Sequence, residues 1–125
     1  MLRSAFRASG GLARGDDLGR LLENQHGGDF VTLADLIGSH DVFGFEWRAM
    51  LWVPMFQFEL CDLSLKRCSR MVLAELSAVF DRWMLALWFA EPNSWLSDRR
   101  PVDVLDANLP SVLRAARTDR FIATG

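Results

Sequence analysis

Two prolines, Pro92 and Pro101, constrain the second half of this chain more than any other feature. Proline has no amide hydrogen for a helix interior but fits the first turn of a helix. Because strongly apolar residues precede Pro92, the sequence predicts a helix that ends there, a short turn through Asn93, and a second helix that Pro101 opens. Four apolar side chains are expected to hold the two elements together: Trp88, Trp95, Leu96 and Leu105.

The spacing of these residues resembles the C-terminal toxin-binding domain of the Xre/MbcA/ParS antitoxin family. In that family a Trp precedes a Pro-Asn pair, which is followed by a Leu, a short polar turn, and a Pro that opens a small helix carrying another Leu. The resemblance covers residues 65–125, and it departs from the family in the turn at Asp98 and Arg99, where members often have Gly. The matching positions are Trp88, Pro92, Asn93, Leu96, Pro101 and Leu105.

The resemblance implies a mainly α fold with a compact helical toxin-binding domain. It implies a cognate toxin of the RES class, which consumes NAD and whose active-site entrance the antitoxin covers, and it implies a homodimer that represses its own operon through DNA. Pro92, Leu96, Pro101 and Leu105 are expected to be structural. The residues expected to touch the partner are Trp88, Asn93, Trp95, Arg99, Arg100, Arg114, Arg117, Arg120 and Phe121.

Composition indicates one folded domain with a small appendage. The chain has 125 residues, 50% of them hydrophobic and 24% charged, which is enough to bury a core. Its longest uninterrupted apolar run, 83–90, falls far short of the roughly 20 residues of a membrane span. We therefore expect a cytoplasmic protein, in which Cys61 and Cys68 act as small apolar residues in preference to a disulfide or a metal site.

Charge is distributed unevenly along the chain. Residues 1–62 hold five Lys and Arg against nine Asp and Glu, whereas residues 63–125 hold nine against seven. Non-specific binding of nucleic acid needs many cations that face phosphates. The acidic first half therefore argues against it.

Residues 1–15 are expected to form a flexible arm. They are rich in small residues and contain the pair Gly10 and Gly11, and their arginines are either solvated or in contact with phosphate. A short helix is predicted after Asp16 and Asp17, because acidic residues are favourable at a helix start.

Residues 16–60 are predicted to form a reduced helix-turn-helix followed by an aromatic β-hairpin. Thr32 and Asp35 fit a capping box at the start of a second helix over 32–38. The position of a recognition helix, 39–44, is short and contains an aspartate and a glycine, which is unfavourable for reading a DNA groove.

The hairpin is predicted from a change to alternating aromatic residues at 43–47. A second strand over 51–58 follows a turn at 48–50, and Pro54 places this strand at a sheet edge or ends its pairing. The hairpin is either the wing of a winged helix or an aromatic cover over the helical core. The segment 54–58 also resembles one that often precedes the toxin-binding domain.

Residues 61–125 are predicted to form the helical domain. Asp62 or Ser64 can cap a helix with an apolar stripe over 65–80, and Asp81 starts the next, 82–90. That helix is apolar on nearly every side, so it lies at the domain centre with one face against another chain.

The last helix is predicted to follow Pro110 and to bury a narrow apolar stripe. Phe121 and Ile122 lie past the stripe beside arginines, which suits an interface, although a frayed terminus with solvated arginines explains the same pattern.

Motifs for catalysis are missing from the sequence. The two histidines are isolated, and the chain has no phosphate-binding loop, no nucleophile motif and no tyrosine. We therefore expect a binding protein without a cofactor. Three hypotheses remain: an antitoxin-like protein that binds a RES-type toxin, a winged-helix regulator whose C-terminal part dimerises, and a structural homologue that has lost both partner and operator.

Overall fold

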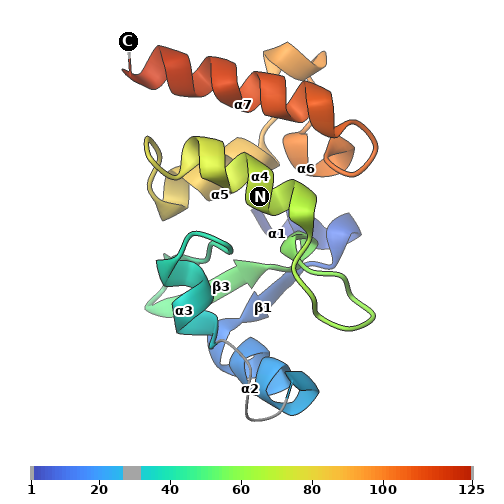
Figure 1. Ribbon diagram of the computed structural model, residues 1–125, viewed down its shortest axis with the longest axis vertical. Coiled ribbons are helices and arrows are strands. Elements are labelled where there is room, and N and C mark those ends of the chain that lie inside the picture. The colour runs from blue at the N-terminus through green and yellow to red at the C-terminus, as the bar shows by residue number, and fades with distance from the viewer. Residues whose placement is uncertain (1, 27–31, 125) are drawn as a thin grey trace.

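The computed structural model describes residues 2–26 and 32–124. These residues form a mainly α-helical fold with a three-stranded antiparallel sheet (Figure 1), and none of their helices is both long and apolar enough to cross a membrane. The helices are α1 (Leu2–Phe6), α2 (Gly15–His26), α3 (Leu33–Gly38), α4 (Arg67–Leu76), α5 (Arg82–Ala90), α6 (Pro101–Val104) and α7 (Leu109–Thr124). The strands are β1 (Leu12–Arg14), β2 (Phe45–Trp47) and β3 (Met50–Pro54), and the 3-10 turns are η1 (Arg7–Ser9), η3 (Met55–Gln57) and η4 (Ser94–Leu96).

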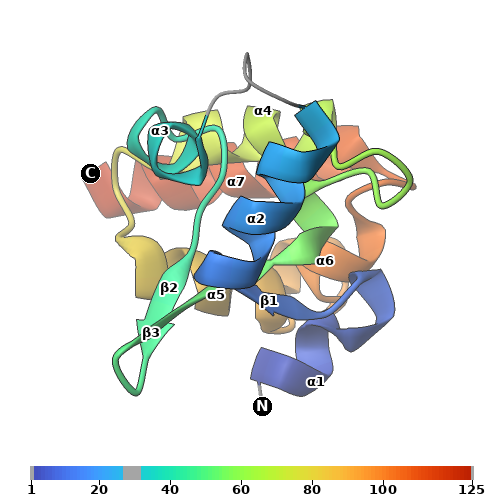
Figure 2. The ribbon, with the colours of Figure 1, turned by 90° about the horizontal axis from the view of Figure 1, so that it is seen from below.

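The sheet lies between two sets of helices. Figure 2 shows α2 in front of the sheet and α5, α6 and α7 behind it. Because side chains alternate along a strand, Val53 joins a smaller apolar cluster with Leu18 of α2 and Leu36 of α3. Phe45 and Trp52 face the other way and join a larger cluster with α4 to α7, which therefore crosses the predicted domain boundary at residue 60.

Residues 2–15 are folded against the rest of the chain, which contradicts the expectation of a flexible arm. Phe6 is fully buried and stacks on Phe56 with ring centroids 5.7 Å apart, and β1 pairs with β3. Gly10 and Gly11 have φ of 109° and 77°, and a side chain at Gly10 would meet Met55 at 3.1 Å. These glycines therefore form a tight turn into β1 instead of loosening the chain.

The predicted aromatic hairpin is confirmed, but its second strand does not reach residue 58 because Met55–Gln57 form the 3-10 turn η3. Its turn is Arg48 and Ala49, with φ of 52° and 63°, as a two-residue type I′ turn requires, and Met50 already belongs to β3. Pro54 ends β3, as one expectation stated, but β3 is the central strand in the order β1-β3-β2, so the edge position is wrong. Proline fits there because β2 pairs with β3 only as far as Trp52, so Pro54 has a neighbouring strand, β1, on one side alone. The ring of Phe45 packs against α5, which agrees with an aromatic cover.

The segment after β3 joins the two apolar clusters. Phe56 packs against Phe89 of α5 at 4.8 Å, whereas Phe58 enters the smaller cluster. Between them Gln57 is fully buried, and its amide accepts from the backbone N–H of Phe43 at 2.8 Å and donates to the carbonyl of Phe43 at 2.9 Å. A buried amide with its hydrogen bonds satisfied fixes the position of this segment.

The N-terminal helices are confirmed, but the recognition helix is not. α2 begins with Asp16 and Asp17 in its first turn. α3 has the expected capping box, in which the Thr32 hydroxyl accepts from the N–H of Asp35 at 3.1 Å. Residues 39–44 form a turn, a bend and an extended stretch, because the chain leaves α3 to enter β2.

The start of α4 differs from the prediction, whereas that of α5 agrees with it. The Asp62 carboxylate accepts from Ser64 within a loop, and Leu63 there has a positive φ of 59°. Helix α4 begins later, after Lys66, with no side-chain cap. Asp81 caps α5 as expected, since its Oδ1 accepts from the Met84 N–H at 2.9 Å.

Candidate partner-binding surface

The motif residues meet where α5 ends and α6 begins. Helix α5 stops before Pro92, and Pro101 is buried in the first turn of α6. Leu96 and Leu105 are 2% and 1% exposed. Pro101, Leu96 and Leu105 therefore lie in the core, whereas Pro92 is exposed just past the end of α5, and the helix end and helix start predicted from the two prolines are present in the fold.

Asn93 belongs to this joint and not to the surface. It is 9% exposed, and its Oδ1 accepts from the N–H of Trp95 at 2.9 Å, which caps η4. Its backbone also pairs with Arg99 in an isolated β-bridge. Because the Asn93 side chain is buried and caps η4, it holds the turn. The prediction that Asn93 contacts a partner protein does not fit this position.

The turn after η4 has a backbone that favours glycine. Ser97 and Asp98 have φ of 58° and 64°. The left-handed region costs a residue with a side chain about 1 kcal/mol. The turn therefore keeps the shape that glycine adopts readily, although this chain has none there.

One carboxylate, Asp119 of α7, holds both tryptophans of the motif region. Trp88 Nε1 donates to its Oδ2 at 2.7 Å, and Trp95 Nε1 donates to its Oδ1 at 3.0 Å. Trp88 is half-buried, whereas Trp95 is 55% exposed. Sequence reasoning missed Asp119, because it is 24 and 31 residues from its partners and no local pattern marks it.

Two of the arginines that were predicted to contact a partner form ion pairs within the chain. Arg117 and Arg120 each lie 3.2 Å from a different oxygen of Glu75 on α4, a link that the sequence analysis missed. Arg99 is exposed, but its Nε–H donates to the carbonyl of Leu96 at 3.0 Å.

The remaining predicted cations, Arg100 and Arg114, are exposed. Within 2–26 and 32–124, neither forms an ion pair. They are therefore free to meet an anionic group on another molecule.

The last turn of α7 lies outside the core. The helix buries Val112, Leu113 and Ala116 as predicted, but Phe121 and Ile122 are 76% and 61% exposed. Ile122 is one turn past Asp119 and therefore on the side of the helix that faces Trp95. Phe121 is two residues past Asp119 and therefore points to another side of α7. We call the three exposed side chains at this end of the molecule, Trp95, Phe121 and Ile122, the C-terminal surface.

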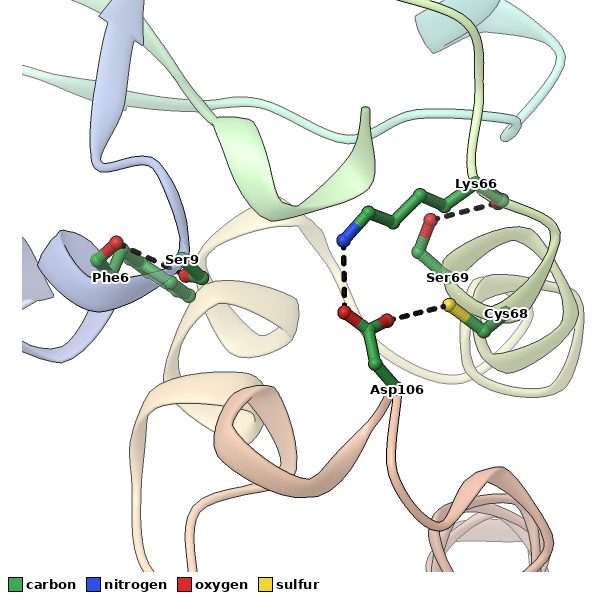
Figure 3. Close-up of polar contacts among 6 residues, drawn as sticks. All are labelled: Phe6, Ser9, Lys66, Cys68, Ser69 and Asp106. Atoms are coloured by element: carbon green, nitrogen blue, oxygen red, sulfur yellow. Dashed lines mark hydrogen bonds and ion pairs between the residues drawn. The ribbon is translucent and has the colours of Figure 1, made fainter. Parts of the chain in front are cut away.

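A cluster of titratable groups joins α4 to the segment after α6 (Figure 3). Lys66 Nζ lies 3.0 Å from Asp106 Oδ2, and Cys68 Sγ donates to Oδ1 of the same carboxylate at 3.2 Å. Lys66 and Asp106 also line a cavity of about 450 Å³ that includes Ser9 and Glu59.

The cluster is not poised for nucleophilic catalysis. Burial, then the hydrogen bond to Asp106, raises the pKa of Cys68 to about 11, so the thiol stays protonated at neutral pH. Burial opposes ionisation of Asp106, but the hydrogen bonds from Lys66 and Cys68 lower its pKa. In the described part of the chain, no three Cys, His, Asp or Glu side chains converge as metal ligands. Neither Cys61 nor Cys68 forms a disulfide bond.

Comparison with known protein families, with curated proteins and with solved structures finds no match for this chain. The antitoxin resemblance therefore depends on the six motif residues and the segment 54–58.

Proposed function

We propose that this chain is an antitoxin-like binding protein that neutralises a RES-type, NAD-consuming toxin by protein–protein contact. The C-terminal surface makes that contact, with Arg100 and Arg114 as additional cations. The exposed last turn of α7 is the single observation that carries the proposal. Two large apolar side chains in water are unfavourable for a free chain and favourable at an interface.

The geometry beside this turn also suits binding. Trp95 is held by Asp119, so its exposed ring is fixed before a partner arrives. A fixed aromatic side chain loses little entropy on binding, and Trp and Arg are frequent at the centres of interfaces.

A DNA-binding function is not part of the proposal. Residues 39–44 do not form a helix, so the position expected for a recognition helix holds none.

Co-expression with a RES-type toxin tests the proposal. The chain is expected to restore growth and cellular NAD, and to co-purify with the toxin. Phe121→Asp combined with Ile122→Asp should weaken the complex at least about thirtyfold, the effect of losing a hot spot of about 2 kcal/mol. Truncation from Arg117 onward is less informative, since it removes Asp119 and both partners of Glu75.

Leu21→Asp on α2 is the matched control, because Leu21 is 51% exposed and lies on another face. It should leave neutralisation intact, and circular dichroism should show that all variants fold. Neutralisation that survives the double substitution would contradict the role of the C-terminal surface, and no complex with any RES-type toxin would contradict the proposed function.

A further inference from the structure

A groove of about 410 Å³ lies where the sheet meets α1 and α5. Trp47 and Trp52 form its floor with Phe45, since Phe45 pairs with Trp52 and Trp47 is two residues further along β2, on the same sheet face. Trp83 of α5 closes one wall, and its ring packs edge-on against Phe45 at 5.7 Å. We call this the tryptophan groove.

The groove exposes a large aromatic surface. Trp47 and Trp83 are 49% and 42% exposed, and two leucines from α1 and β1 complete an apolar lining. Concave, apolar surfaces rich in Trp are typical of binding sites and costly to leave in water.

The charges around the groove are positive. Arg3 lines it, and the guanidinium carbon of Arg48 lies 4.2 Å from the centroid of the Trp47 ring. Neither arginine forms an ion pair in the described part of the chain, and no Asp or Glu lines the groove there. Two carboxylates close to the groove in sequence do not line it. Glu46 lies on the opposite face of the sheet, and Asp81 accepts a hydrogen bond as the cap of α5.

Trp52, on the floor of the groove, has an indole N–H without a hydrogen-bond acceptor among the described residues. This Nε1–H is buried. Buried indole N–H groups usually find an acceptor. Because this nitrogen is buried, the apolar lining and the arginines are what the groove offers to an occupant.

A single strand of nucleic acid fits less well. It needs a row of cations along its backbone, whereas the described residues around this groove offer two, Arg3 and Arg48.

We propose that the tryptophan groove binds an extended segment of a protein partner in which a large apolar side chain is flanked by acidic residues. The apolar side chain fills the space between the indoles, and the flanking carboxylates pair with Arg3 and Arg48. The inference is independent of the proposed function, because the groove and the C-terminal surface share no residue.

An array of fluorescent hexapeptides tests this binding by anisotropy. The peptides carry a central pair of Phe, Leu or Pro residues, and all four flanking positions are Glu, Ser or Lys. A Glu-flanked peptide is expected to bind saturably, and its Lys counterpart at least tenfold more weakly at low salt. Arg3→Glu should weaken the Glu-flanked peptide about tenfold, and Arg3→Glu with Arg48→Glu should reverse the preference, whereas Arg67→Glu, the control at the exposed start of α4, should change neither.

Nuclear magnetic resonance locates the occupant. With the indole N–H signals assigned by single Trp→Phe variants, the peptide should shift those of Trp47, Trp52 and Trp83 but not those of Trp88 and Trp95. Four results would overturn the inference: no saturable binding in the array, equal binding of Glu and Lys peptides, shifts confined to Trp88 and Trp95, or groove signals that respond only to oligothymidine or to self-association of the protein.

Discussion

Two groups of tryptophans in this protein differ in how their indoles are satisfied. Trp88 and Trp95, near the C-terminal end, both donate to Asp119. The indole N–H of Trp52 in the tryptophan groove has no partner among the described residues, and Trp47 and Trp83 expose their rings. A tryptophan-rich sequence therefore does not by itself mark a surface that needs a partner. What matters is whether an acceptor from a distant part of the chain reaches it.

The structure changes which part of α5 is available to a partner. Helix α5 was expected to be too apolar for a single copy of the chain, and most of it is in fact covered, with Leu85 and Phe89 at 4% and 0% exposure. Its uncovered part is the N-terminal turn, where Trp83 and Met84 are each 42% exposed. The apolar surface available to partners thus includes the sheet side of the molecule.

The largest effect is expected from removing the shared acceptor. Asp119→Leu leaves two indole N–H groups without a partner, one of them half-buried, and should lower the free energy of unfolding by about 2–3 kcal/mol. Asp119→Asn keeps one acceptor and should cost less. Urea unfolding measures both, with the slope against denaturant unchanged. Equal stability of Asp119→Leu and the unsubstituted chain would show that the two indoles do not depend on this carboxylate.

The same substitution at two sites sharpens the comparison. Trp88→Phe removes a donor to Asp119 and should cost about 1–2 kcal/mol more than Trp52→Phe, which removes an unsatisfied donor while keeping an aromatic ring. Both changes lose similar volume, so the difference isolates the hydrogen bond. Urea midpoints that fall equally for the two variants would argue that Trp52 is satisfied in solution.

Alkaline pH is expected to lower the stability of the fold through Cys68 and not through either group of tryptophans. The pKa of Cys68 is raised from 9.0 to about 11 in the folded chain, so folding favours the protonated thiol. Its contribution to stability is present below pH 9 and is lost as the pH rises toward 11, by about 1 kcal/mol after allowance for partial exposure. Cys68→Ser should flatten this decline in urea midpoint. A decline that persists unchanged in Cys68→Ser would show that this thiol does not cause it.

The smallest effect is expected in the turn that follows Trp95. Asp98→Gly relieves a left-handed conformation but makes the unfolded chain more flexible, so it should stabilise the protein by less than about 1 kcal/mol. Asp98→Ala should be neutral or slightly destabilising. Thermal unfolding can resolve the difference, and a clear loss of stability in Asp98→Gly would show that the aspartate side chain holds the turn.

Short-range patterns in the sequence were enough to predict the local elements. The box of Thr32 and Asp35, the cap at Asp81 and the helix start at Pro101 all involve contacts within four residues. The aromatic alternation likewise predicted the hairpin. Such features depend on backbone donors and side chains that are neighbours in any conformation, so the sequence alone determines them.

Tertiary structure decided the rest, because it depends on contacts between distant residues. The N-terminal strand becomes part of the sheet only when β3 is beside it, and Asn93 turned out to hold a turn. Asp119 reaches Trp88 across 31 residues, whereas no acceptor among the described residues reaches Trp52. Which indoles are satisfied, and therefore which surfaces are left for partners, follows from the way the helices pack against the sheet.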